Sequence, residues 1–220
     1  MVKVKLCGNQ TLEDVEVTAG ADAQGFIVMA DSRREVQPET AAELIGHVPL
    51  FTSSVLVTTV ADPLLIADMV EVLAPDAVQV HAELSPINIQ RIRRALDIRT
   101  RFYTVLGVTE DAEAKGDEAQ RMAESGIDGL LLDSRVGAKI GGTGQTHNWE
   151  TSAAICDILD PLPVILAGGL TPENVVEAIG TVRPYAVDIA SGVETDGKKD
   201  PAKVQALLKQ VRHYEHGSTN

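Results

Sequence analysis

A thiol and a carboxyl stand in this sequence where each could transfer a proton. Cys7 ends an alternating apolar stretch and precedes Gly8, and Asp133 directly follows three leucines. An apolar environment raises the pKa of a carboxyl, so that it can donate a proton near neutral pH, and a thiol becomes a base once it is deprotonated. Each residue alone also has a structural explanation, an inert buried cysteine or an aspartate that caps a turn. Together they predict general acid–base catalysis. The second cysteine, Cys156, falls in a helical pattern and is interpreted as an inert apolar residue.

Glycine-rich turns follow three successive apolar segments in the second half of the chain. They contain Gly141-Gly142-Thr143-Gly144, Gly168-Gly169 and Ser191-Gly192-Val193-Glu194. Glycine lets backbone N–H groups approach an anion closely, and a short helix after the last segment would point its positive end at a phosphate. One such turn alone is more often only a tight turn, but three in succession favour a phosphate-binding site.

Two further polar residues follow apolar segments. Arg34 could bind a substrate carboxylate through two hydrogen bonds, although an arginine considered alone is more often a solvated loop residue. His81 is a candidate substrate contact, and the alternative for it is a hydrogen-bonded residue at a strand end. The His, Cys and Asp residues do not have metal-ligand spacing, so no metal is expected. A Gly-x-Gly-x-x-Gly motif does not open a helix after the first strand, which disfavours dinucleotide binding.

Eight strand patterns alternate with eight helical patterns along the chain. The strands are predicted near residues 2–6, 24–29, 54–58, 77–80, 101–106, 128–132, 163–166 and 185–189, and the helices near 11–19, 38–46, 62–74, 86–97, 110–125, 148–159, 172–182 and 201–214. Alternation implies parallel pairing, and the even spacing of roughly 25 residues favours a closed (β/α)8 TIM barrel over an open doubly wound sheet. We therefore predict an α/β fold with one barrel domain over residues 1–220 and a frayed tail at residues 215–220.

Strand parity predicts which side chains enter the barrel. In the first strand Val4 and Leu6 should pack on the helices, which leaves Lys5 and Cys7 pointing inward. In the last strand the same argument predicts that the side chain of Asp188 points into the barrel. Because a lone buried charge is costly, Lys5 and Asp188 are predicted to pair, in a structural or positioning role rather than through a Schiff base.

Composition restricts the class of protein further. Hydrophobic residues make up 44% of the 220 residues but aromatic residues only 3%, so the core must consist of Val, Ile, Leu and Ala, as is typical of parallel sheets covered by helices. The formal charge of −13 disfavours nucleic-acid and anionic-membrane partners. No apolar run approaches the ~20 residues of a membrane span, and the first residues lack a signal-peptide pattern. We expect a cytoplasmic protein, monomeric or homodimeric, that acts on a small phosphorylated molecule.

The motifs occur in an order that resembles one family. They are Lys5-Leu6-Cys7-Gly8, Gln79-Val80-His81, Leu131-Leu132-Asp133-Ser134, Gly141-Gly142-Thr143-Gly144, Ala167-Gly168-Gly169-Leu170 with Pro172-Glu173-Asn174-Val175, and Val187-Asp188 through Ser191-Gly192-Val193-Glu194 to Gly197, Lys198 and Asp200. Together they cover nearly the whole chain, and the sequence resembles phosphoribosylanthranilate isomerase. The resemblance implies an Amadori rearrangement of N-(5-phosphoribosyl)anthranilate to 1-(2-carboxyphenylamino)-1-deoxyribulose 5-phosphate without a cofactor.

The resemblance also implies a role for each candidate residue. Asp133 would be the general acid that protonates the furanose oxygen, and Cys7 the general base that takes the C2′ proton. Arg34 would hold the anthranilate carboxylate, with His81 as a further candidate contact. The phosphate would lie against Gly142, Gly144, Gly168, Gly169, Ser191 and Gly192.

The chain departs from the family pattern at several positions. Asn9-Gln10 follows Cys7-Gly8, Arg33 stands in place of a proline, Ala82 follows His81 in place of a glycine, and residues 145–149 are unusually polar. These positions should surround the anthranilate side of the pocket. One alternative is therefore a paralogous barrel isomerase for another phosphorylated aminosugar. A second is a non-catalytic barrel that binds a phosphorylated metabolite, but a pure binder would need neither Cys7 nor Asp133.

Overall fold

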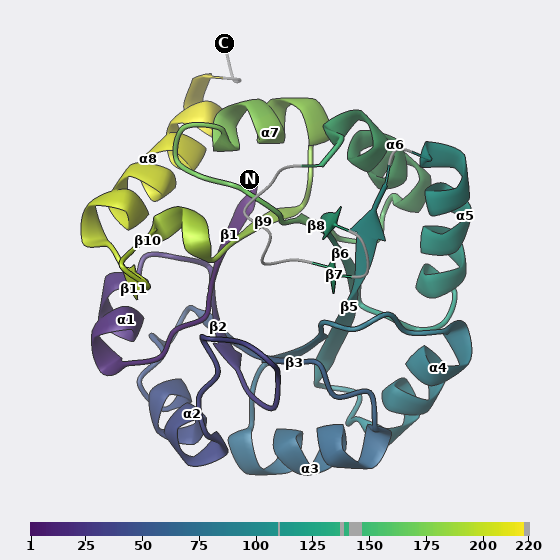
Figure 1. Cartoon of the computed structure of the whole chain (residues 1–220), viewed down its shortest axis with the longest axis horizontal. Coiled ribbons are helices and arrows are strands. Elements are labelled where there is room, and N and C mark those ends of the chain that lie inside the picture. The colour runs from purple at the N-terminus through teal and green to yellow at the C-terminus, as the bar shows by residue number, and fades with distance from the viewer. Residues whose placement is uncertain (110, 137–138, 141–146, 218–220) are drawn as a thin grey trace.

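Eight parallel strands close into a barrel in the computed structural model (Figure 1), which describes residues 1–220 except 110, 137–138, 141–146 and 218–220. The barrel strands are β1 (Lys3–Cys7), β2 (Ala23–Ile27), β3 (Ser53–Thr58), β4 (Ala77–Val80), β5 (Arg101–Val108), β6 (Gly129–Val136), β8 (Val164–Leu166) and β9 (Ala186–Ile189). Neighbours along the chain pair in parallel, β1 pairs with β9, and β5 pairs with β6, so the ring is closed. The predicted TIM barrel is confirmed.

Helices surround the barrel on its outer side, as Figure 1 shows. They are α1 (Leu12–Val17), α2 (Pro38–Ile45), α3 (Pro63–Leu73), α4 (Pro86–Ala95), α5 (Ala112–Ala123), α6 (Trp149–Leu159), α7 (Val175–Val182) and α8 (Pro201–Gly217). Each lies within a few residues of its predicted range. Helix α1 begins with a capping box, in which the Thr11 hydroxyl accepts from the Asp14 N–H and the Asp14 carboxylate accepts from the Thr11 N–H, both at 3.1 Å.

One predicted helix start is wrong. Helix α7 begins at Val175, not at Pro172. The Thr171 N–H donates to Oδ1 of Asn174 at 2.8 Å, and the Glu173 N–H donates to the Thr171 hydroxyl at 3.3 Å. These local bonds form a turn before the helix, so Thr171 is not its N-cap.

The apolar core consists of two layers between strands and helices and a smaller cluster inside the barrel. The interior cluster contains Val55, Val57, Tyr103, Val105, Leu131, Ala167 and Cys7. Val4 and Leu6 belong instead to the outer layer with α7 and α8. The inward direction predicted for Cys7 is therefore confirmed.

Three short strands were not predicted, and the short helix expected after the last barrel strand is a single 3-10 turn. β7 (Lys139–Ile140) pairs antiparallel with the end of β6, and a 3-10 turn, η1 (Ser191–Val193), follows β9. β10 (Glu194–Thr195) and β11 (Lys198–Lys199) then form an antiparallel hairpin beside α1. Within the described part of the chain, no helix is both long and apolar enough to span a membrane.

Candidate active site

A pocket of about 550 Å³ opens at the carboxyl ends of the barrel strands. It is lined by eight of the predicted site residues, namely Cys7, Arg34, His81, Asp133, Gly168, Gly169, Ser191 and Gly192. The other two, Gly142 and Gly144, lie outside the described residues. The topology thus brings together residues that are far apart in the sequence, at the end of the barrel where enzymes of this fold carry their sites.

A second hollow of about 710 Å³ lies where α3 and α4 end and β4 and β5 begin. It is at the opposite end of the strands from Cys7. Its polar lining includes Glu71, Asp76 and Arg99 but none of the predicted site residues. We therefore assign the candidate site to the pocket at the carboxyl ends.

Asp133 is a buried carboxyl on β6. Burial raises its pKa to about 7, and the nearby Asp188 acts in the same direction. Two effects act the other way, a hydrogen bond of 2.7 Å from the Ser134 N–H and the charge of Lys5. A carboxyl with this pKa can hold and donate a proton at neutral pH.

His81 faces Asp133 and is oriented by its neighbours. Its Nε2 lies 3.8 Å from Asp133 Oδ2, and its Nδ1 lies 3.2 Å from Nε2 of Gln79. Tyr103 donates to Oε1 of Gln79 at 3.1 Å, which turns the amide nitrogen of Gln79 toward the imidazole. His81 Nδ1 is therefore the acceptor, and a neutral His81 carries its proton on Nε2, facing Asp133.

Cys7 lies beside a buried ion pair. Lys5 Nζ and Asp188 Oδ2 are 2.7 Å apart and opposite each other in the β1–β9 register, which confirms the predicted pair. Burial raises the pKa of the Cys7 thiol, although Lys5 opposes this shift. Among the described residues, Oδ1 of Asp188 is buried without a hydrogen bond, and Asp188 lines the pocket. The sequence predicted a structural or positioning role for Asp188, and its inward position at a strand end also makes it a candidate substrate contact.

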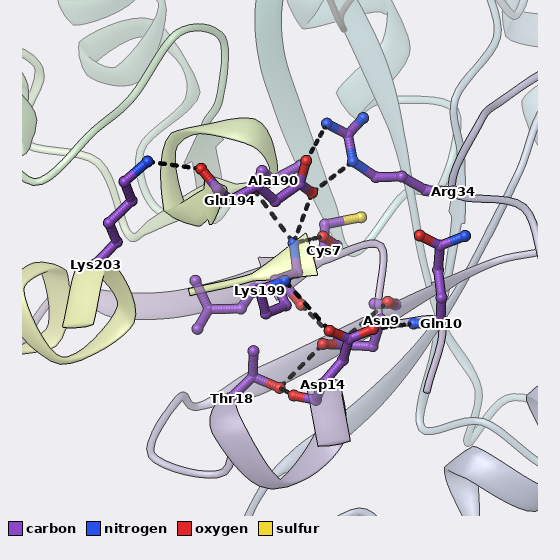
Figure 2. Close-up of polar contacts among 12 residues, drawn as sticks. Cys7, Asn9, Gln10, Asp14, Thr18, Arg34, Ala190, Glu194, Lys199 and Lys203 are labelled. Atoms are coloured by element: carbon purple, nitrogen blue, oxygen red, sulfur yellow. Dashed lines mark hydrogen bonds and ion pairs between the residues drawn. The ribbon is translucent and has the colours of Figure 1, made fainter. Parts of the chain in front are cut away.

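Arg34 is held in place by Glu194. Its Nε and Nη2 donate to the two oxygens of that carboxylate at 2.6 and 2.8 Å (Figure 2). Arg33 donates to the same carboxylate at 2.9 Å. Although burial opposes the shift, hydrogen bonds from Arg34 and the charge of Lys199 hold the pKa of Glu194 below its usual value. With its side chain only 12% exposed, Arg34 is not a solvated loop residue. Neither of these two bonds uses Nη1 of Arg34, so Nη1 can donate to a substrate.

The turns after β8 and β9 pack against each other and against Asp133. Gly168 has a φ of +85°, and a Cβ there would collide with the Ser134 hydroxyl and lie 2.8 Å from Oδ1 of Asp133. A Cβ on Gly192 would overlap the carbonyl oxygen of Leu170. Only glycine fits at either place, and both glycines line this wall of the pocket.

His147 is a half-buried residue near the acid to which the sequence alone gave no role. Its Nδ1 lies 3.3 Å from the Ser134 hydroxyl, and its Nε2 lies 2.6 Å from the Ser152 hydroxyl. Burial lowers the pKa of His147 to about 4, so it is neutral at physiological pH. The polar segment before α6 was the available signal, but its spacing alone could not show which strand it reaches.

Several departures from the family pattern do not line the pocket, among them Asn9, Gln10 and Ala82. Asn9 is fully buried, and its amide donates to the Leu6 and Gly25 carbonyls at 3.2 and 3.4 Å. Ala82 packs against the outer core. Arg33 does line the pocket, beside Glu194. Of these positions Arg33 lines the pocket, whereas Asn9, Gln10 and Ala82 do not, and residues 145–146 lie outside the described residues.

The barrel and its pocket define an enzyme of the (β/α)8-barrel class. The model of the N-(5'-phosphoribosyl)anthranilate (PRA) isomerase family matches residues 4–210. The chain belongs to this family, which confirms the resemblance inferred from its motifs.

Curated relatives and solved structures agree with this assignment. The chain is 42% identical to N-(5'-phosphoribosyl)anthranilate isomerase 1 of Methanosarcina mazei, over 96% of this chain and 94% of the relative. It is 44% identical to the isomerase of Haloarcula marismortui, over 99% and 100%. The structure of phosphoribosyl anthranilate isomerase from Thermotoga maritima is similar with a TM-score of 0.84 and 34% identity, over 97% of this chain and 100% of that one.

Proposed function

We propose that the protein catalyses the reaction of its family, the isomerisation of N-(5'-phosphoribosyl)anthranilate to 1-(2-carboxyphenylamino)-1-deoxyribulose 5-phosphate in tryptophan biosynthesis. Family membership supports the activity, which is an intramolecular oxidoreduction of the aldose–ketose type. A similar structure, at 32% identity and a TM-score of 0.81, is described as a complex with reduced 1-(o-carboxyphenylamino)-1-deoxyribulose 5-phosphate. The observation that carries the proposal is a carboxyl with a pKa of about 7, Asp133, in one pocket with Cys7.

In the proposed mechanism Asp133 donates its proton to the furanose ring oxygen. The C1′–oxygen bond breaks as the nitrogen lone pair forms the Schiff base. The Cys7 thiolate then takes the C2′ proton, and the electron pair of that bond neutralises the iminium nitrogen. The resulting enolamine tautomerises to the ketone. These steps are proton transfers that need no electron acceptor outside the substrate.

Substrate binding is divided between two walls of the pocket. We propose that Arg34 Nη1 binds the anthranilate carboxylate and that Oδ1 of Asp188 accepts from a substrate hydroxyl, because both residues line the pocket. The phosphate is proposed to bind at the open turns of Gly168, Gly169, Ser191 and Gly192.

The activity can be tested by genetic complementation. We expect the gene for this chain to restore growth without tryptophan to a strain that lacks the isomerase. The Asp133→Asn gene serves as the matched control and should not restore growth. Failure of the parent gene, when the protein is present in the cells, would contradict the proposed function.

Changing Arg34 to Ala is expected to weaken substrate binding by roughly 1.5–3 kcal/mol, the range for a hydrogen bond to a charged group. This corresponds to a rise in KM of about tenfold to a hundredfold. Arg33→Ala is the matched control, because Arg33 contacts the same carboxylate from a side chain that is 64% exposed. Its KM should change much less. Equal KM values for the parent and Arg34→Ala would show that Arg34 does not bind the substrate.

Phosphate or sulfate is expected to bind at the turns that follow β8 and β9. A crystal soaked with either anion should show it within hydrogen-bond distance of the N–H groups of Gly169 and Gly192 or of the Ser191 hydroxyl. An anion found only elsewhere, with these turns empty, would argue against this phosphate site.

We further propose that the protein is a single domain over residues 1–220 that acts in the cytoplasm as a monomer or homodimer. The net charge of −13 fits an enzyme without nucleic-acid or membrane partners. One similar structure concerns a Thermotoga maritima enzyme described as dimeric. Light scattering on the purified protein would distinguish the two states, and a larger assembly would contradict both.

A further inference from the structure

A lysine on the β10–β11 hairpin is buried at the edge of the pocket. The Lys199 side chain is only 1% exposed. Its Nζ donates to the Cys7 carbonyl at 2.6 Å, to the Ala190 carbonyl at 3.3 Å and to Oε1 of Glu194 at 3.1 Å (Figure 2). An ammonium has three N–H donors, and here each one has an acceptor. This complete bonding is what allows a charged lysine to be buried.

Neutralising Glu194 does not explain this lysine. That carboxylate already receives two bonds from Arg34 and one from Arg33. The two other bonds of Lys199 go to backbone carbonyls on different strands. They have no charge to neutralise, so their effect is to fix the backbone.

The two carbonyls lie just where the pairing of β1 with β9 stops. The last pair in the register of these strands is Leu6 with Ile189, and Cys7 and Ala190 are the next residues on each strand. Lys199 Nζ therefore joins the two strand ends beyond their last ladder pair. Cys7 is at one of these ends, and the η1 turn with Ser191 follows the other.

The hairpin that carries Lys199 is itself anchored. The Lys199 N–H donates to Oδ1 of Asp14 at 3.3 Å, and the other oxygen of Asp14 accepts from the N–H groups of Gln10 and Thr11. Figure 2 shows Asp14 on the side of Lys199 away from Arg34. The backbone of Lys199 is thus fixed to α1 while its side chain reaches the pocket wall.

We propose that Lys199 is a positioning residue for the isomerisation, which holds the strand end that carries Cys7 at a fixed place against the Ser191–Val193 turn. The base and the phosphate site then keep a constant separation. This inference rests on the proposed function, in which Cys7 is the base and the turn binds phosphate. It assigns Lys199 no direct contact with the substrate.

The charge of Lys199 also affects the pKa of the Cys7 thiol. The titratable and charged groups that face Cys7 are Lys5 on β1, Arg34 after β2, Tyr103 on β5, Asp188 on β9 and Lys199 on β11. Burial raises the pKa of the thiol most, Asp188 adds to this rise, and Lys5 and Lys199 lower the pKa. Loss of the Lys199 charge should therefore make the thiol harder to ionise.

The test compares Lys199→Met with Lys203→Met, both in a Cys156→Ser background that leaves Cys7 as the one thiol. Lys203 is the matched control, because its Nζ donates to the Glu194 carbonyl at 2.7 Å without a bond to Cys7 or Ala190. The readout is the rate of Cys7 alkylation by iodoacetamide as a function of pH, measured beside kcat and KM. Lys199→Met should shift the alkylation profile to higher pH, with a rate at least roughly threefold lower at neutral pH, which corresponds to half a pKa unit. Its kcat should fall, and Lys203→Met should match the parent in both measurements.

An alkylation profile of Lys199→Met that coincides with the parent would overturn the inference, as would an equal shift in Lys203→Met. Circular dichroism checks the fold of each variant. If Lys199→Met does not fold, Lys199→Gln takes its place, since its neutral amide can still donate, and the same shift is required of it. Failure of the proposed function gives a different result, in which the folded parent does not turn over N-(5'-phosphoribosyl)anthranilate while Lys199→Met still shifts the alkylation profile.

Discussion

Replacing Asp133 by Asn is expected to lower kcat by about 10²–10⁴-fold, the contribution of a general acid, while KM stays within a few-fold of the parent value. The amide preserves the shape of the side chain but has no proton to give to the furanose oxygen. The measurement is steady-state kinetics, in which the loss of substrate fluorescence reports turnover. A kcat within a few-fold of the parent would show that Asp133 is not the acid.

The pH profile gives a second, independent signature of Asp133. The proposed mechanism requires a protonated Asp133, with a pKa of about 7, and an ionised Cys7, whose pKa burial raises above its ordinary value. Below about pH 7 the Asp133 carboxyl is already protonated. In that range kcat/KM should decrease as the pH is lowered, because the fraction of Cys7 that is ionised decreases. Above about pH 7 the loss of the carboxyl proton offsets the gain in thiolate, and the profile should level off. In Asp133→Asn this bend should disappear, and the residual rate should keep rising with pH.

Thermal unfolding distinguishes a lost proton donor from a damaged fold. The pKa of Asp133 rises from 3.8 to about 7 on folding, so the folded state binds this proton more tightly than the unfolded state. Ionisation of Asp133 therefore destabilises the protein as the pH rises through that interval. Asparagine has no such ionisation, so Asp133→Asn should unfold at the same temperature as the parent or higher above about pH 7. A lower Tm there would mean that the loss of activity reflects the fold.

The second large effect is expected for Cys7→Ser. A hydroxyl is nearly the size of a thiol but is far less easily deprotonated at neutral pH, so kcat should fall by about 10²–10⁴-fold. Cys156→Ser is the matched control, since Cys156 lies on α6 outside the pocket and burial raises its pKa to about 12. That variant should keep the parent kcat and KM. Full activity in Cys7→Ser would exclude the thiol as the base.

The barrel could be predicted from the sequence because its signals are local and repeated. Most of the barrel strands and the helices around them are long enough to show their own period. Strand parity was sufficient to pair Lys5 with Asp188 across the closing strands. The three leucines before Asp133 were sufficient to predict the direction of its pKa shift. The start of α7 was wrong because the turn depends on side-chain bonds from Thr171 and Asn174 that Pro172 does not reveal.

The parts of the site that sequence reasoning missed depend on contacts between distant residues. Arg34 was ambiguous because its partner, Glu194, lies 160 positions away. Lys199 received no role because it reaches the Cys7 carbonyl across 192 positions from a strand of two residues, which is too short to show a period. The resemblance drew attention to the segment from Ser191 to Asp200, but only the packing shows that its lysine joins two strand ends.

The most direct test of the central claim is the turnover of N-(5'-phosphoribosyl)anthranilate by the purified protein, measured beside Cys7→Ser and Asp133→Asn. We predict a loss of substrate fluorescence that saturates with substrate concentration in the parent and is reduced by about 10²–10⁴-fold in each variant. A folded parent that does not turn over this substrate would contradict the proposed activity. A parent that turns it over no faster than both variants would contradict the assignment of acid and base.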